Sequence, residues 1–239
     1  MTGGSDPNPA RGRGERAAAR RAALGLRRRP PGELMFAYSD RINHALSFAA
    51  KHYEGSADGA AGMGYVGHPA NVGVILARYD CDQPTVVAGI LHHVLDEARP
   101  DRREALEEKI GDKFGPVVLG ILKDAAEPRY DHRGAERSWR ARKYDLLANL
   151  GVAEPRALDV IAASEIHRCG STIAALRRLG AEYLRTVAQA SSDEAIWWYR
   201  SMAEVLAARD DWPQRRMLDE LRALALDLVR SLQQREEEL

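Results

Sequence analysis

The chain has 239 residues, of which 45% are hydrophobic and 29% charged, and its acidic and basic side chains are equal in number. This composition excludes a fibrous or fully disordered protein and suffices for one large hydrophobic core or two small ones. No apolar run reaches the roughly 18 to 20 residues of a bilayer helix, and no secretory leader is evident, so we expect a soluble cytoplasmic protein with no membrane partner. Two cysteines, Cys81 and Cys169, exclude a disulfide scaffold or a cysteine-rich zinc module.

Residues 1–32 differ from the rest of the chain in charge and composition. They carry eight arginines against Asp6 and Glu15, a net charge of about +6, and almost no large apolar side chains. Because such a segment cannot offset its ordering entropy by burial, we predict a disordered basic tail. The tail is either an anchor for nucleic acid or another anionic surface, or a solvated extension. The segment has no aromatic residues to stack on bases, which makes a nucleic-acid partner the weaker hypothesis.

From Tyr38 onward, apolar residues recur at the spacing of amphipathic helices. Ser39 or Asp40 can cap a first helix that Gly55 ends, and the glycine-rich stretch 55–67 is predicted as a loop. The next helices begin at His68 and Pro84. Further helices are predicted around 102–114, 116–125, 136–150, 155–169, 171–188, 193–209 and 214–235. Because no stretch alternates with a period of two, the predicted fold class is all-α, a single domain over 33–190 with C-terminal helices 191–239 packed on it.

Histidine placement gives the clearest indication of a functional site. His68 lies at a predicted helix start, and His92 and His93 are adjacent in the next predicted helix. Asp96 and Glu97 follow four residues later, one helical turn from the two imidazoles. Such a group can hold a cation and position a water for general-base attack. The alternative is a polar helix face with two ordinary histidines.

Five short motifs, in this order, resemble the HD-domain alarmone hydrolases. These are the hydrolase halves of the long stringent-response proteins and the small single-domain enzymes that remove the 3′-pyrophosphate from (p)ppGpp. The motifs are Tyr65–Val72, Ala88–Glu97, Lys113–Gly115, Trp139–Lys143 and Ala162–Arg168. The resemblance covers roughly residues 38–180. It implies an HD-domain helical bundle and a metal-dependent phosphohydrolase acting on a nucleotide such as (p)ppGpp.

The resemblance also implies a set of site residues. In that family a divalent metal, commonly manganese, is bound by two histidines and two aspartates, and an acidic pair one turn further along activates the attacking water. The positions that correspond to the metal ligands are His68, His92, His93 and Ser164. The corresponding acidic pair is Asp96 and Glu97. His93 and Ser164 therefore stand where the family has aspartates.

These two replacements change the metal that we expect. The family set contributes two negative charges and this set contributes none, so manganese should bind more weakly. Three imidazoles with an open position are a known arrangement of catalytic zinc, in which the metal lowers the pKa of bound water toward about 7. The cofactor expected is therefore divalent manganese or zinc. The alternative is a catalytically inactive HD-domain module that binds a nucleotide or a protein partner.

Four basic residues are candidates for binding the substrate phosphates: Arg140, Arg142, Lys143 and Arg168. The first three share a predicted helix that faces the phosphates in the resembled enzymes, and guanidinium groups suit bidentate hydrogen bonding to phosphate. A solvated helix face is the alternative. Arg168, one turn from Ser164, either places a cation near the emptied ligand position or is a surface arginine. An Arg-Lys pair that the family has after its first helix is missing here, which favours the inactive alternative.

The C-terminal helices carry three consecutive aromatic residues, Trp197, Trp198 and Tyr199. Consecutive residues cannot share one helix face, so we expect core and interface packing rather than a base-stacking platform. The sequence leaves the oligomeric state open, a homo-oligomer included.

Overall fold

The computed structural model describes residues 38–52, 66–180 and 191–236. The chain divides into two compact units, Met1–Ser39 and Asp40–Leu239, and the second contains all the helices described. The predicted tail and most of the predicted loop 55–67 lie outside the described residues. Within the described part, all regular structure is helical, as predicted, apart from an isolated bridge between Tyr130 and Glu136. None of these helices has the length and apolarity needed to cross a bilayer.

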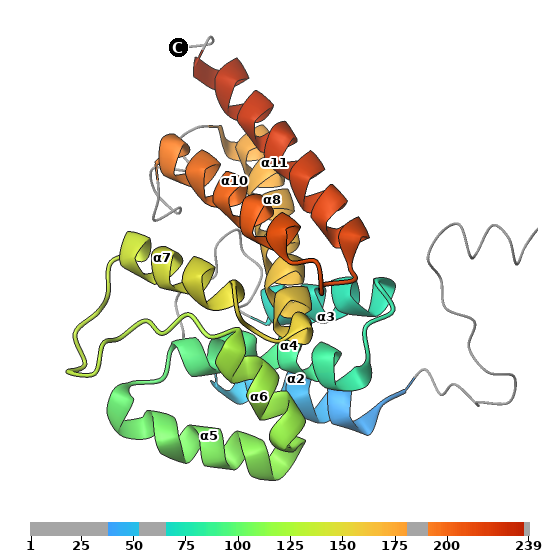
Figure 1. Ribbon diagram of the computed structural model, residues 1–239, viewed down its shortest axis with the longest axis vertical. Coiled ribbons are helices and arrows are strands. Elements are labelled where there is room, and N and C mark those ends of the chain that lie inside the picture. The colour runs from blue at the N-terminus through green and yellow to red at the C-terminus, as the bar shows by residue number, and fades with distance from the viewer. Residues whose placement is uncertain (1–37, 53–65, 181–190, 237–239) are drawn as a thin grey trace, which may run out of the picture. The chain divides into compact units, whose positions relative to one another are not determined.

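Figure 1 shows the helices of the described residues in chain order. Their bounds are α2 Asp40–His52, α3 Gly67–Arg78, α4 Gln83–Asp96, α5 Pro100–Phe114, α6 Pro116–Asp124, α7 Trp139–Leu150, α8 Pro155–Leu179, α10 Ser192–Ala208 and α11 Arg215–Glu236. Most of these bounds lie within two residues of the predicted ones, because proline and capping residues mark the helix starts.

Helix α4 forms the centre of the bundle. It packs against α2, α3, α5, α6 and α8 (Figure 1). Its sequence is apolar on nearly all sides, which is the pattern of a helix buried all round. Asp82 caps its start by accepting a hydrogen bond from the Thr85 N–H, with Pro84 in the first turn. Because α4 also carries His92, His93 and Asp96, those polar groups are placed inside the core.

Helix α8 runs without interruption from Pro155 to Leu179, so the prediction of separate helices over 155–169 and 171–188 is wrong. Gly170 lies inside α8, where a single glycine costs only about 1 kcal/mol relative to alanine. The buried residues Cys169, Ile173 and Leu176 continue the apolar stripe across it. The helix ends at Gly180, whose φ of 75° is a left-handed conformation that favours glycine. Helix α8 thereby reaches from the core of the bundle to the C-terminal helices.

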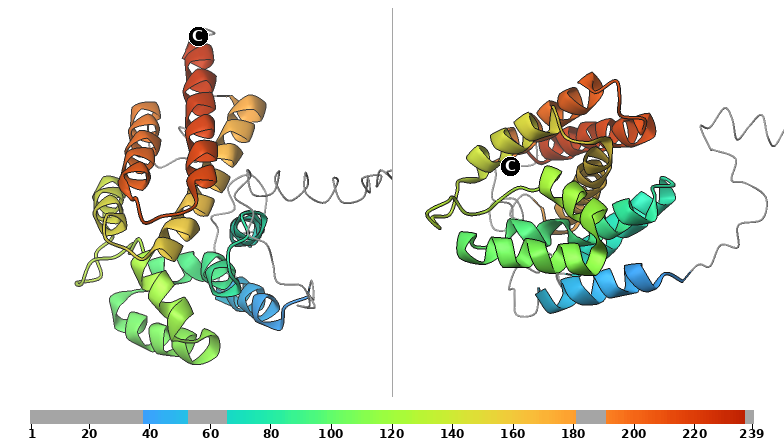
Figure 2. Two further views of the ribbon diagram at one scale, coloured as in Figure 1. Left: turned by 45° about the vertical axis from the view of Figure 1, so that its right-hand side comes forward. Right: turned by 60° about the horizontal axis from the view of Figure 1, so that its bottom comes forward.

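Helix α11 packs against both α8 and α10, and α10 also contacts α7 (Figure 2). Trp198 and Tyr199 on α10 are buried, whereas Trp197 is partly buried and its ring contacts that of Tyr144 on α7 in a tilted arrangement. The prediction that these aromatic residues serve packing is confirmed. The C-terminal helices therefore share the hydrophobic core with α8.

Candidate metal centre

The structure brings His68, His92 and His93 together although they come from two helices. His68 lies in the first turn of α3, and the other two lie in the last turns of α4. One nitrogen from each ring lies within 4.8 Å of the others, so the three can hold one metal ion. The ring centroids of His92 and His93 are 3.8 Å apart, and that of His68 lies 5.4 Å from the first and 5.1 Å from the second. Close packing of α3 on α4 creates this cluster.

Ser164, on the buried face of α8, completes the group of four positions. Its Oγ lies 3.0 Å from the Nε2 of His92 and 3.2 Å from the Nε2 of His68. The hydroxyl thus stands between two imidazole nitrogens, where the resembled family has a carboxylate. A neutral hydroxyl is a poor ligand for a divalent ion, so the three imidazoles are the stronger donors here.

The hydrogen-bond donors and acceptors around Ser164 determine the tautomers of His92, His68 and His167. The Nδ1 of His92 lies 2.7 Å from the Gly89 carbonyl and must donate to it, which leaves Nε2 as an acceptor. Ser164 has one proton and donates it to that Nε2, so the His68 Nε2–H donates to Ser164. The His68 Nδ1 then accepts from the Nδ1–H of His167, 2.8 Å away. Each of these contacts is satisfied with neutral histidines.

A second chain of contacts runs through His93. Its Nε2 lies 2.6 Å from the Arg168 guanidinium, which can only donate. The Nδ1–H of His93 therefore donates to Asp96 Oδ2, 2.8 Å away, while Asp96 Oδ1 accepts the Glu127 backbone N–H at 2.7 Å. Arg168 is thus directed at the histidine cluster and is not a surface arginine.

Burial sets the protonation of these groups. It lowers the pKa of His92 to about 3 and holds the pKa values of His68 and His93 well below their ordinary value, with the Arg168 charge adding to each effect. The imidazoles are therefore neutral at pH 7, as metal ligation requires. Burial, together with the charge of the nearby Glu127 carboxylate, raises the pKa of Asp96 to about 7. Asp96 can consequently take up or release a proton near neutral pH.

Asp96 and Glu97, the predicted acidic pair, have different partners. Asp96 is buried against His93, whereas Glu97 caps the end of α4 and pairs with Arg129 at 3.0 Å. Adjacent residues at a helix end point about 100° apart, which accounts for the separation. Asp96 is the carboxylate in direct contact with the histidine cluster.

The candidate phosphate-binding residues divide into two groups. Arg142 and Lys143 both pair with Glu127, at 3.2 and 2.8 Å, and Lys143 is only 3% exposed. Lys143 also lies 3.6 Å from the buried Glu165. Arg140 instead lies over the rings of Tyr144 and Trp197, away from these carboxylates. Lys143 is therefore buried and does not lie on a solvated helix face. The structure does not bring Arg140 to the histidine cluster.

Glu127 is a site residue that sequence reasoning missed. It lies in the connection between α6 and α7, where no periodicity or motif marks it. Its backbone N–H holds Asp96 and its side chain holds Arg142 and Lys143. Burial opposes ionisation, but the charge of Lys143 and other nearby cations lowers the pKa of Glu127 overall. Glu127 thus connects Asp96, the candidate catalytic carboxylate, to Arg142 and Lys143, two of the candidate phosphate-binding residues.

The donor set fits a divalent ion that prefers nitrogen. His92 and His93 offer Nε2 while a carbonyl and a carboxylate hold their Nδ1–H groups, which is how metal-binding histidines are usually held. His68 can offer its own Nε2 if its proton moves to Nδ1 and His167 becomes the acceptor. Arg168 lies on the Nε2 of His93 and has to turn away for that nitrogen to bind metal. Zinc suits this set better than manganese or magnesium.

An all-α bundle with histidines from two successive helices and an aspartate beside them is a helical domain with a candidate metal centre. Residues 45–190 match the family model of the HD domain, which covers about three fifths of the chain. The chain belongs to the HD domain family. The resemblance and the HD-domain helical bundle predicted from the motifs are both confirmed.

Two curated relatives are similar to part of the chain. A guanosine-3′,5′-bis(diphosphate) 3′-pyrophosphohydrolase of Aquifex aeolicus is 30% identical over 86 residues, 36% of this chain and 12% of the relative. A GTP pyrophosphokinase rsh of Brucella ovis is 30% identical over 90 residues, with the same coverage. The matched region thus spans about an eighth of the length of these relatives.

Two solved structures share the fold. A metazoan orthologue of SpoT, described as hydrolysing ppGpp, superimposes with a TM-score of 0.58 at 20% identity and covers 84% of this chain and 98% of its own. The protein lmo0812 of Listeria monocytogenes EGD-e gives a TM-score of 0.55 at 21% identity, with 66% of this chain and 96% of its own covered. Each of these chains is matched over nearly its whole length.

Proposed function

We propose that this chain is a metal-dependent phosphohydrolase of the HD family that acts on a nucleotide related to (p)ppGpp. The observation that carries the proposal is the convergence of one nitrogen each from His68, His92 and His93 beside the buried carboxyl of Asp96. The similarity to ppGpp-hydrolysing relatives supports the substrate class. The three histidines, with Ser164 beside them, would hold zinc or manganese, and the metal when bound would polarise a phosphoryl oxygen and acidify water.

In this proposal the protein side chains perform the proton transfer and bind the phosphates. Asp96 accepts the proton of the attacking water, since its pKa of about 7 suits a general base at neutral pH. Glu97, held by Arg129, is the second carboxylate of the pair, at the end of α4. Arg168 turns from His93 toward the substrate, and Arg142 and Lys143 supply positive charge beside it. Arg140, which lies over Tyr144 and Trp197, contributes positive charge from further out.

A second candidate is an inactive HD-domain module that binds a nucleotide or a protein partner. Two observations favour it. The chain of hydrogen bonds from His167 through His68 and Ser164 to His92 is complete without a metal. The positively charged guanidinium of Arg168 also lies against His93, where it opposes the approach of a metal cation. The two candidates therefore differ in whether the cluster binds a metal.

Restoring the family's carboxylates tests the proposed function. We expect His93→Asp combined with Ser164→Asp to strengthen manganese binding about tenfold or more, because two negative charges then face the ion. Pyrophosphate release from ppGpp should rise with metal occupancy. Isothermal titration with manganese and an assay of pyrophosphate release measure the two effects.

A control in the restored protein separates catalysis from binding. Asp96→Asn added to the double variant should keep the metal but lower turnover by about a hundredfold or more, since a general base typically contributes that much. If the restored protein binds manganese tightly and remains inactive on every nucleotide tried, the proposed substrate class is wrong.

A further inference from the structure

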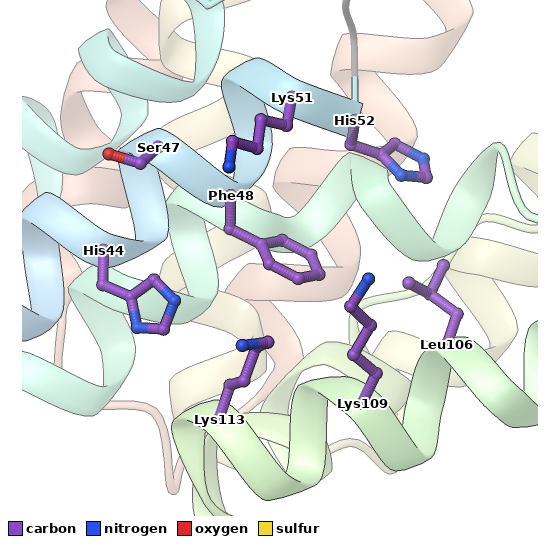
Figure 3. A pocket seen from close by; sticks show the side chains of 8 residues that line it. All are labelled: His44, Ser47, Phe48, Lys51, His52, Leu106, Lys109 and Lys113. Carbon is purple, nitrogen blue, oxygen red and sulfur yellow. The ribbon is translucent and has the colours of Figure 1, made fainter.

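A separate cavity, lined by basic and apolar side chains, lies between α2 and α5 (Figure 3). Its volume is about 360 Å³, which is within the usual range of small-molecule sites. Five basic side chains line it: His44, Lys51, His52, Lys109 and Lys113. None of these residues belongs to the histidine cluster on α3 and α4 or to the ion network around Glu127.

The described residues that line this cavity carry charge of one sign. No carboxylate is among them, although α5 contains several acidic residues. In the described part of the chain, Lys51, Lys109 and Lys113 form no ion pair, whereas Lys123 and Arg103 nearby both pair with Glu107. A concave surface lined by one sign of charge concentrates ions of the opposite sign. The cavity therefore favours an anion.

One wall of the cavity is aromatic and fixed in place. Phe48 points from α2 toward α5, with the amino groups of Lys109 and Lys113 on the facing helix (Figure 3). Its ring packs edge-on against the buried Phe114, with centroids 5.5 Å apart, and Lys109 Nζ lies 5.6 Å from its centroid. Leu106 adds a second apolar contact. An anchored ring next to amino groups can stack on a nucleobase while the amino groups bind phosphate.

We propose that the cavity between α2 and α5 is a nucleotide-binding site, in which Lys51, Lys109 and Lys113 bind the phosphates and Phe48 contacts the base. The lysines act as flexible point charges, so a diphosphate that reaches two or three of them should bind more tightly than a single phosphate. This site does not depend on the proposed hydrolase activity, because it shares no residue with the histidine cluster.

Isothermal titration of the metal-free full chain with GDP and with inorganic pyrophosphate tests the proposal. We expect saturable one-to-one binding of GDP at about 0.15 M salt, where non-specific surface attraction is largely screened. Lys109→Gln combined with Lys113→Gln should weaken GDP binding about tenfold or more. Phe48→Leu should weaken GDP more than pyrophosphate, because only GDP has a base to stack.

Two controls make the outcome decisive. The pair Arg102→Gln and Arg222→Gln removes the same charge from exposed positions outside the cavity, and we expect it to leave GDP affinity unchanged. Arg168→Gln removes the cation at the histidine cluster and so detects any GDP that binds at that cluster instead of the cavity. The proposal is wrong if GDP does not bind saturably. It is also wrong if the exposed arginine pair lowers GDP affinity as much as the lysine pair does, or if Arg168→Gln alone abolishes GDP binding. Equal loss of GDP and pyrophosphate on Phe48→Leu would overturn the nucleotide assignment.

Discussion

Ser164 has one proton and two imidazole neighbours, and this fixes the direction of the hydrogen bonds in the site. It donates to His92 and accepts from His68, which in turn accepts from His167. An aspartate at this position has no such proton to donate to His92 and would instead be suited to bind a metal together with the two histidines. One substitution thus converts a ligand position into a hydrogen-bond relay, and metal binding then requires the His68 proton to move to its other nitrogen.

Asp159 lies outside the histidine cluster, so the effect of one buried carboxyl group on stability can be measured there separately. Burial raises its pKa to about 6, although the Trp212 indole N–H donates to it at 2.7 Å. Because the folded-state pKa lies above the unfolded value, its contribution to stability is present at low pH and is lost as pH rises from about 4 to 6. We expect the wild type to lose about 2 kcal/mol relative to Asp159→Asn between about pH 4 and pH 7.

Urea denaturation of both proteins at the two pH values measures this difference, with tryptophan fluorescence as the probe. Asparagine keeps an oxygen that can accept from the indole, so the comparison isolates the ionisable proton. A difference between the two proteins that stays constant with pH would show that Asp159 does not titrate in the folded state as inferred.

The convergence of residues 68, 92, 93 and 164 could be anticipated from the sequence, because the order of the motifs indicates which helices pack together. The contact between Arg168 and His93 could be anticipated only as one of two alternatives, since it depends on how a long side chain is directed. Glu127 could not be anticipated. Its role arises from the path of the non-helical segment after α6, which brings its backbone N–H to Asp96.

At the scale of elements, the approach of α3 to α4 positions the cluster, and Gly89 permits that approach. A Cβ atom at Gly89 would lie 2.2 Å from Leu76 Cδ1 and 3.1 Å from Val72 Cγ1. Leu76 and Val72 are fully buried, so neither can move freely. The same stretch of backbone offers the Gly89 carbonyl to His92. The spacing between His68 and His92 therefore depends on this glycine.

We expect Gly89→Ala to lower the free energy of unfolding by about 1 to 3 kcal/mol, the usual cost of overpacking a core. It should also weaken metal binding by separating α3 from α4. Gly120→Ala is the matched control, because a Cβ there meets nothing within 4 Å, and it should raise stability by up to about 1 kcal/mol. Chemical denaturation measures both. If Gly89→Ala is as stable as Gly120→Ala, the close approach does not constrain the site.

Most helices could be predicted from apolar periodicity and proline or capping signals, as at Asp82 and Pro84. The continuity of α8 could not, because a glycine and a serine at 170 and 171 resemble a helix end. Tertiary packing keeps α8 continuous, because the buried apolar stripe through Ile173 and Leu176 stabilises the helix across residues 170 and 171.

At the scale of the whole molecule, buried charges join the helices that carry the site to the C-terminal helices. Lys143 of α7 lies between Glu127 and Glu165, and its amino group is 4.1 Å from the centroid of Trp198 on α10. The Trp198 indole N–H also donates to Glu165 at 2.9 Å. Both carboxylates depend on Lys143 for part of their charge compensation.

We expect Lys143→Met to lower the free energy of unfolding by about 3 kcal/mol, because it leaves two buried carboxylates short of positive charge. Adding Glu165→Gln should restore part of that loss, and a double-mutant cycle measures the coupling. Arg177→Met is the control, since it breaks an ion pair with Asp227 that is largely exposed and should cost less than about 1 kcal/mol. If Lys143→Met costs no more than this control, the network does not hold the C-terminal helices in place.

Zinc binding tests most directly whether the histidine cluster is a metal centre. In a titration of metal-free protein against a competing chelator, we expect one zinc per chain, an affinity about a hundredfold lower in His68→Ala, His92→Ala and His93→Ala, and no change in the control His132→Ala, an exposed histidine. Arg168→Gln should bind zinc more tightly than the wild type, because the competing cation is gone. Zinc binding that is absent, or that persists unchanged without these three histidines, would contradict the account.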